Sequence, residues 1–81
     1  MLARLIACAL IASPHRRPTW RFEIEVHEAG GTFLTKTVTL PSIHLIAESD
    51  KAGPLYDLCR AIRDAEERDY ETFIGKDFGA H

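Results

Sequence analysis

Histidines and acids are the side chains with which this 81-residue chain could do acid–base chemistry, and their spacing forms no known catalytic motif. The four histidines are His15, His27, His44 and His81. No two of them stand in the HExxH spacing that holds zinc in metalloproteases. His27 lies beside Glu25 and Glu28, and on a strand His27 and Glu25 would share one face. A solvated strand histidine explains this neighbourhood.

Nucleophiles and phosphate-binding loops give no stronger signal. The sequence has no GxSxG, P-loop or GxGxxG motif, and Gly30-Gly31 is typical of a hairpin turn. Cys59 has no histidine near it in the sequence that could activate it as a nucleophile. A chain this short also has little material for a water-excluding pocket. We therefore expect a protein that is not an enzyme and holds no cofactor.

The two cysteines, Cys8 and Cys59, are far apart in apolar surroundings. They could form one disulfide in an oxidising compartment, or serve as small buried hydrophobic residues. No CxxC or Cys/His cluster has metal-ligand spacing, so we expect no metal site. The cysteine usage favours a reduced, cytoplasmic protein.

Charge is distributed unevenly along the chain. The net charge of −2 is too small to predict bulk attraction to nucleic acids or membranes. Residues 1–26 carry four arginines against two glutamates, whereas residues 54–81 carry seven acids against four bases. The chain is therefore mildly dipolar, with a basic first part and an acidic last part.

Residues 54–74 show the clearest helical pattern. Pro54 suits a first helical turn, and Gly75 suits the left-handed residue after a helix. One side of this helix is apolar (Leu55, Leu58, Cys59, Ile62 and Phe73, with Tyr70 at its edge). Glu66 and Asp69 fall near the apolar side in the later turns, where they would either extend past the sheet into solvent or pair with a base.

The other side of the predicted helix is the first candidate site. Its partner-binding acids would be Asp57, Asp64, Glu67 and Glu71. An acidic helix face could bind a basic surface on a larger protein or ribonucleoprotein complex, or could simply keep the protein soluble.

Residues 19–40 predict a β-hairpin. Trp20, Phe22, Ile24 and Val26 alternate with polar residues, which is typical of a strand with one buried face. The turn at residues 29–31 leads to a second strand, whose Leu34, Val38 and Leu40 would share the inner face. We expect Lys36 to lie near the edge of the sheet.

Three other segments complete the chain. Residues 1–13 could be a strand, a helix or an export signal; a strand is favoured, apolar on both faces as a central strand would be. Residues 42–49 fit either a strand or a helical turn after Pro41. Residues 76–81 are expected to fray.

The segment of residues 15–21 is the second candidate site. Its basic and aromatic side chains that could grip a phosphate backbone and stack a base are Arg16, Arg17, Trp20 and Arg21. A solvated loop with Trp20 in the core is the alternative. Direct nucleic-acid binding is not the favoured function, because the basic segment is short and the whole chain is acidic.

Together these patterns predict one α+β domain over residues 1–81. We expect a two-layer arrangement in which an antiparallel sheet (hairpin 19–40 plus one or two further strands) packs against one long C-terminal helix (54–74). The expected function is that of a non-enzymatic interaction protein that binds a larger protein or ribonucleoprotein complex stoichiometrically. We expect no membrane as a partner. The alternative is a small nucleic-acid-binding protein using residues 15–21.

In size and charge the chain is similar to small phage-encoded inhibitors of host defence, such as anti-CRISPR proteins, which are often compact, acidic and poor in motifs. That similarity implies a host nuclease or ribonucleoprotein complex as the partner, blocked at its basic nucleic-acid-binding surface. The acids Asp57, Asp64, Glu67 and Glu71 would then stand in for phosphates.

Overall fold

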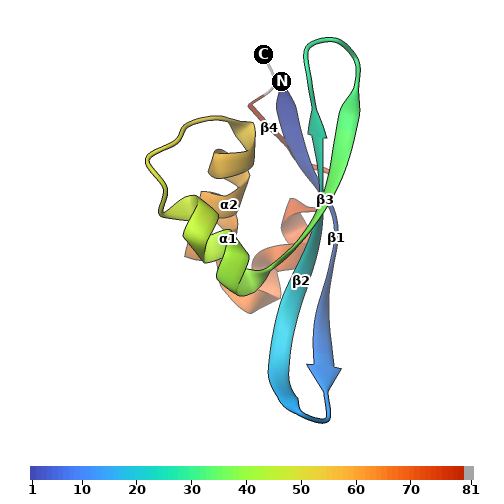
Figure 1. Ribbon diagram of the computed structural model, residues 1–81, viewed down its shortest axis with the longest axis vertical. Coiled ribbons are helices and arrows are strands. Elements are labelled where there is room, and N and C mark those ends of the chain that lie inside the picture. The colour runs from blue at the N-terminus through green and yellow to red at the C-terminus, as the bar shows by residue number, and fades with distance from the viewer. Residues whose placement is uncertain (80–81) are drawn as a thin grey trace.

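The computed structural model describes residues 1–79, which fold into a sheet with helices on one side. In chain order the elements are β1 (Leu2–Ser13), β2 (Arg16–His27), β3 (Phe33–Thr39), α1 (Leu40–Ala47), α2 (Pro54–Asp64), the 3₁₀ helix η1 (Glu67–Phe73) and β4 (Asp77–Phe78). The four strands form an antiparallel sheet in the order β3-β2-β1-β4. The helices cover one face and leave the other open (Figure 1). The α+β class and the antiparallel sheet agree with the sequence prediction.

The alternating pattern of β2 gives the sheet its two faces. Phe22, Ile24 and Val26 are buried beneath the helices, and the residues between them point to the open face. Residues 2–13 form the strand that the sequence favoured. An irregularity in β1 between Leu5 and Ala7 shifts its register, so that Leu5 pairs with Ile24 and Cys8 pairs with Phe22.

One hydrophobic core lies between the sheet and the helices. Its buried residues come from every layer: Ala3, Leu5, Phe22, Ile24, Val26, Ile43, Ala47, Leu58, Cys59, Ile62 and Tyr70. Trp20 and Phe73 are partly buried against this cluster. The covered face of the sheet therefore supplies about half of the core, as expected of a two-layer domain.

The prediction of one long helix over residues 54–74 is wrong. α2 ends at Asp64, Ala65 and Glu66 are extended, and η1 follows as a separate 3₁₀ helix. A continuous α-helix would have turned Glu66 and Asp69 toward the core, where unpaired carboxylates are costly. The break leaves both acids exposed, and Glu66 pairs with Arg68 at 2.8 Å.

The 3₁₀ geometry of η1 also explains how its aromatic residues reach the core. Side chains three residues apart are eclipsed in a 3₁₀ helix. Tyr70 and Phe73 have this spacing; Tyr70 is 4% exposed, and Phe73 is half-buried. The packing of the predicted helix is thus divided between two elements, α2 and η1.

Residues 40–47 form α1, which resolves the open choice between strand and helix. The predicted second strand ends at Thr39, one residue early, and Leu40 begins the helix with Pro41 in its first turn. Ile43 and Ala47, one helical turn apart, are the buried residues of α1.

The expected burial of Leu34 beneath the long helix is also wrong, since Leu34 is 55% exposed. The hairpin extends past the short helices, so its end near Phe33 and Leu34 has no helix above it (Figure 1). Lys36, on the edge strand β3, is exposed, as its edge position predicts.

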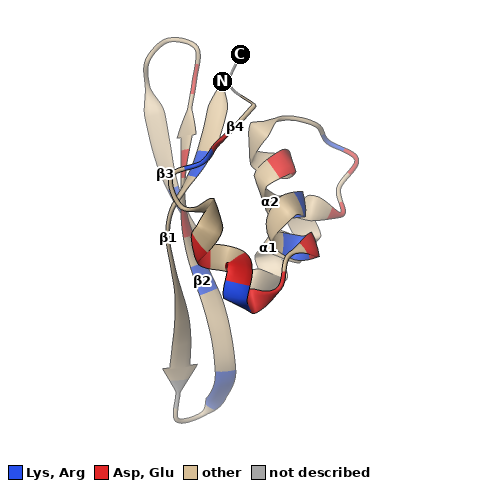
Figure 2. Ribbon diagram, turned by 180° about the vertical axis from the view of Figure 1, so that it is seen from behind, with Lys and Arg blue, Asp and Glu red and all other residues tan. Residues whose placement is uncertain are grey.

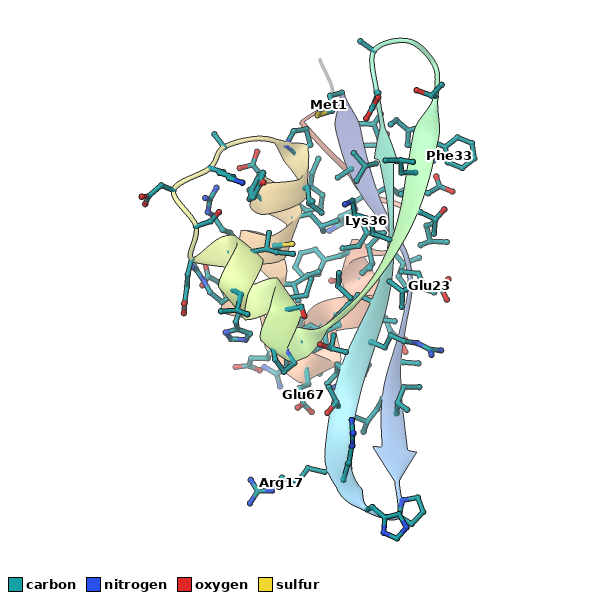
Figure 3. The ribbon with its side chains drawn as sticks, in the orientation of Figure 1. Met1, Arg17, Glu23, Phe33, Lys36 and Glu67 are labelled. Carbon is teal, nitrogen blue, oxygen red and sulfur yellow. The ribbon has the colours of Figure 1, made fainter. Side chains whose placement is uncertain are left out.

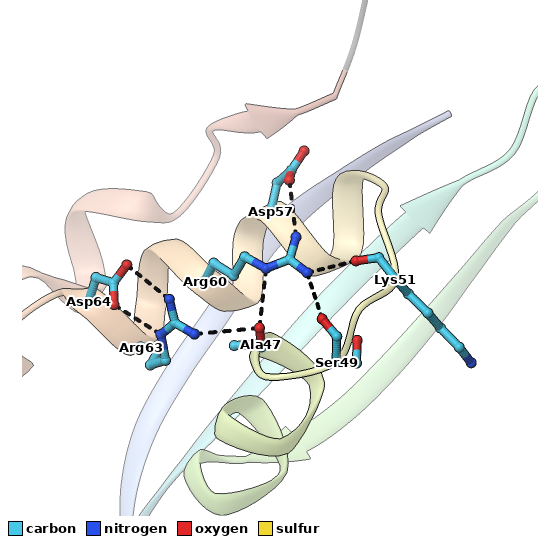
Figure 4. A network of polar contacts seen from close by, with 7 residues as sticks. All are labelled: Ala47, Ser49, Lys51, Asp57, Arg60, Arg63 and Asp64. Carbon is cyan, nitrogen blue, oxygen red and sulfur yellow. Dashed lines mark hydrogen bonds and ion pairs between the residues drawn. The ribbon is translucent and has the colours of Figure 1, made fainter.

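Arginines of α2 connect the two α-helices (Figure 4). Arg60 donates hydrogen bonds to the carbonyl oxygens of Ala47 (3.1 Å), Ser49 (3.0 Å) and Lys51 (2.6 Å). These include carbonyl groups at the end of α1, which have no partner inside the helix. Arg63 adds a longer contact to Ala47 at 3.4 Å.

The segment after η1 is partly ordered, contrary to the expectation that residues 76–81 fray. Gly75 has a left-handed φ of 84° and donates its N–H to the carbonyl oxygen of Leu5 at 2.9 Å. Asp77 and Phe78 then pair with β1 as β4. The rest of that expectation concerns residues 80–81, which lie outside the described residues, as does the candidate histidine His81.

Candidate interaction surface

The β1–β2 hairpin projects beyond the packed body. β3 pairs with β2 only as far as Arg21, and Ala9 is the residue of β1 opposite Arg21. Residues 10–20 beyond this pair form a two-stranded ribbon, which we call the arm (Figure 1). The arm accounts for the elongated shape of the molecule, whose principal extents are 43 × 24 × 20 Å.

Three of the four predicted nucleic-acid contacts gather on one surface of the arm and its base. Arg16, Arg17 and Arg21 line a depression of about 530 Å³ together with Ile11 and Thr39, among others. All three arginines are exposed, and Figure 3 shows Arg17 extending from the end of the arm. The basic segment of the sequence is therefore a real cluster of charge.

These arginines differ from the other four in having no acidic partner within residues 1–79. Each of the others forms an ion pair: Arg4 with Asp77, Arg60 with Asp57, Arg63 with Asp64 and Arg68 with Glu66. Figure 2 shows the contrast, because the ribbon of the arm carries only basic colour while the helices carry both signs. The charge of the arm is therefore available to a partner.

Trp20, the fourth predicted contact, is not part of this cluster. It follows Thr19 and precedes Arg21, so its side chain lies on the opposite, helix-covered face of β2. Its ring packs on Phe22 (centroids 6.4 Å apart) and against the edge of Tyr70 (5.1 Å). The indole Nε1 is buried without a hydrogen-bond partner. Trp20 thus anchors the base of the arm to η1.

The exposed apolar residues of the arm lie on both of its faces. Leu10 is 52% exposed and Ile11 is 42% exposed. Leu10 pairs with Trp20 and so faces the helix side, while Ile11 pairs with Thr19 and faces the open side. Leu10 borders a depression that Leu40 and Pro41 of α1 and Glu67 of η1 also line, yet Leu10 and Ile11 both stay largely exposed.

The four predicted acidic contacts are divided between two elements. Asp57 and Asp64 belong to α2, where Asp57 lies 3.7 Å from Arg60 and Asp64 lies 2.9 Å from Arg63. The hydrogen bond from Arg63 lowers the pKa of Asp64 below its usual value. Glu67 and Glu71 belong to η1 and line a second depression, of about 430 Å³, with Trp20 and Arg68. The acids therefore do not form one continuous helix face.

The acid–imidazole neighbourhood exists as a hydrogen bond on the open face of the sheet. His27 Nε2 lies 2.8 Å from Glu25 Oε1, and the ring stacks on Phe33 with centroids 5.3 Å apart. Across the sheet Arg4 donates to Asp77 at 2.6 Å and holds the pKa of that carboxyl below its usual value. This polar row covers β4, β1 and β2, and its ordinary role is to stabilise a solvated face.

The cysteines are both free. Burial raises the pKa of Cys59 to about 11, and burial followed by the charge of Glu71 raises the pKa of Cys8. A raised pKa keeps a thiol protonated and slow to react. Within residues 1–79, no three histidine, cysteine or acidic residues are grouped closely enough to hold a metal ion.

The free edge of β1 is a surface that the sequence pattern did not predict. β1 is flanked by β4 only at Ala3 and Arg4, and its residues 6–12 have no strand on that side within the described chain. This run is apolar and uncharged, a pattern that fits an unprotected edge as well as the central strand that the sequence predicts. None of the helices of residues 1–79 has the length and apolar character needed to cross a bilayer.

Comparisons of the chain with known protein families, curated proteins and solved structures found no match.

Proposed function

We propose that this is a non-enzymatic interaction protein that binds a larger protein or ribonucleoprotein complex stoichiometrically through its arm. The observation that carries the proposal is the group of three arginines, Arg16, Arg17 and Arg21, which have no ion-pair partner within the described chain and line one depression with Ile11. Arginine is one of the residue types enriched at protein interfaces and at their hot spots. A partner with acidic groups around an apolar pocket would complement this surface.

The shape of the arm supports the same proposal. A two-stranded ribbon that projects from the body can enter a concave partner without obstruction by the helices. The unpaired backbone N–H and C=O groups of the arm can also hydrogen-bond to an edge strand of a partner's sheet. Both cysteines are free, which supports the proposal that the protein acts in the reducing cytoplasm.

The acids of η1 are a further part of the proposed surface. Glu67 and Glu71 have no ion-pair partner within residues 1–79 and lie beside Trp20, near the base of the arm. Asp57 and Asp64 already neutralise arginines of α2 and so contribute less net charge to any contact. An inhibitor that imitates phosphates at a basic partner surface would use Glu67 and Glu71.

A second candidate is nucleic-acid binding by the same arginines. The depression that they line favours it, because unpaired arginines bind phosphates well. Two observations weigh against it: Trp20 is turned away from the arginines, and the helical layer beside the arm is acidic.

Charge reversal in the arm and at its base tests the proposal. The double variant Arg17→Glu/Arg21→Glu should lose a partner that the unmodified protein recovers in stoichiometric amount, as measured by affinity capture and mass spectrometry. The matched control is Lys36→Glu, an exposed charge reversal on β3, which should keep the partner. Equal recovery by both variants would remove the arm from the interaction.

A labelled oligonucleotide separates the two candidates. A nucleic-acid binder should bind it at low salt and lose affinity steeply as salt rises. Absence of binding at low salt would eliminate the second candidate and leave the first unaffected.

A further inference from the structure

Apart from the outer side of the two-residue β4, the sheet has three free edges in the described chain, and they differ in how they resist pairing with another strand. β3 is an edge strand along its whole length, β2 is unpaired on one side over residues 16–20, and β1 is unpaired on one side over residues 6–12. Natural edges are protected by charged side chains and by proline, which make strand addition unfavourable. Lys36 stands in the middle of the β3 edge, and Arg16, Arg17 and Pro18 stand on the β2 edge.

The unpaired side of β1 over residues 6–12, which we call the β1 edge, has no such protection. Its sequence is IACALIA, without a charge or a proline in seven residues. An apolar edge strand of this kind, partly buried over residues 6–8 and exposed over residues 9–12, is a template for another strand. Since the other two edges are protected, the lack of protection here indicates a surface that is occupied by a strand.

We propose that the β1 edge pairs antiparallel with the β1 edge of a second copy of this chain, joining the two sheets about a two-fold axis at Ala9. This inference does not rest on the proposed function, because the pairing itself uses the main chain of β1; the arginines of β2 enter only in the choice of direction. A two-fold contact is the commonest way for identical chains to assemble.

The side chains fit this register. With Ala9 opposite Ala9 of the second copy, residues 7–11 are paired, which is the regular stretch between the two irregularities of β1. Each larger side chain then faces a smaller one: Ile11 faces Ala7, and Leu10 faces Cys8. Opposite residues share a face, so Leu10 and Ile11, both exposed in the single chain, gain apolar neighbours.

Charge favours the antiparallel direction over the parallel one. Antiparallel pairing directs the basic tip of each arm toward the other copy's η1 and β4, which lie beside the start of β1. Glu71 of η1 is close enough to β1 for its charge to raise the pKa of Cys8. Parallel pairing would instead place the two basic tips together, where they would repel each other.

Sedimentation equilibrium of the full chain tests the proposal. The unmodified protein should dimerise, and Ala9→Lys should raise the dimer dissociation constant by about tenfold or more, because it places like charges opposite each other at the axis. Ala9 is exposed, so the substitution leaves the core untouched. The matched control is Thr37→Lys, at a position on the β3 edge that is also exposed, which should leave the dissociation constant unchanged.

Three results would overturn the proposal: a monomer at concentrations up to about 100 μM, open-ended filaments, or a dimer weakened by Thr37→Lys and not by Ala9→Lys. A second variant covers the case in which Ala9→Lys does not fold. In a Cys8→Ala background, Ala9→Cys should form a disulfide-linked dimer under mild oxidation, whereas Thr37→Cys should not. The absence of this cross-link would also contradict the two-fold axis at Ala9.

Discussion

At the scale of single residues, the arginines of this chain have two different roles. Arg60 lies among carbonyl oxygens of the chain itself, whereas Arg17 and Arg21 line an open depression. The guanidinium group suits both roles, since its fixed fork of donors can satisfy several acceptors at once. The two groups differ in whether a hydrogen-bond acceptor of the same chain lies within reach of the guanidinium group. No local sequence pattern reveals this difference.

The two cysteines should differ in reactivity. Cys59 is fully buried and burial raises its pKa to about 11, whereas Cys8 is only partly buried. Under native conditions at neutral pH we expect a thiol reagent to label Cys8 slowly and Cys59 not at all. Mass spectrometry of the labelled protein checks this, and denaturant should make both thiols react. Faster labelling of Cys59 than of Cys8 in the native state would contradict the burial described above.

At the scale of elements, the contact between α1 and α2 depends on one side chain as much as on apolar packing. Arg60 satisfies carbonyl groups in and just after the last turn of α1, and Ile43 and Ile62 are buried in the core beneath the two helices. α1 has only eight residues, too few to be stable alone. Its helical state is therefore maintained by its neighbours.

Removing the Arg60 guanidinium should loosen α1. We expect Arg60→Ala to lower the free energy of unfolding by about 1–3 kcal/mol, since it leaves several carbonyl groups without their donor. Chemical denaturation measures the loss. Arg60→Lys should recover only part of it, because an ammonium group cannot reproduce the fork geometry. Full recovery by lysine would show that charge alone matters there.

At the scale of the whole molecule, a thin core supports a long ribbon. Only eleven residues of the described chain are buried hydrophobics, and the arm extends well beyond them (Figure 1). A domain of this size buries a modest share of its surface and has a small margin of stability. Pairing with a second strand would therefore stabilise the arm as well as cover it.

The thin core makes single core substitutions severe. Ile62 is fully buried, and Ile62→Ala should cost about 2–5 kcal/mol of unfolding free energy. The matched control is Leu45→Ala on α1, whose side chain is 70% exposed and should cost little. Thermal unfolding followed by circular dichroism compares the two. Similar losses for both variants would mean that Leu45 is covered in solution, as by a partner.

Part of this architecture could be predicted from the sequence because it depends on local periodicity. The alternation of Phe22, Ile24 and Val26 defines the buried face of β2, and the spacing of Leu58, Cys59 and Ile62 defines that of α2. Both follow from the period of the backbone and the burial of apolar side chains, which need no knowledge of the neighbours. The basic cluster was also visible, because its members are adjacent in the chain.

Only the tertiary structure decided where the long helix breaks and which strands are left open. The helical pattern of residues 54–74 is locally sound, yet the core has no place for Glu66 and Asp69, and the chain breaks at residues 65–66 to keep both in water. Whether an apolar strand is central or at an edge depends on which strand lies beside it, here the two-residue β4. Contacts between segments that are distant in the sequence decided both outcomes. Only these contacts show that the apolar run of β1 lies at an edge of the sheet.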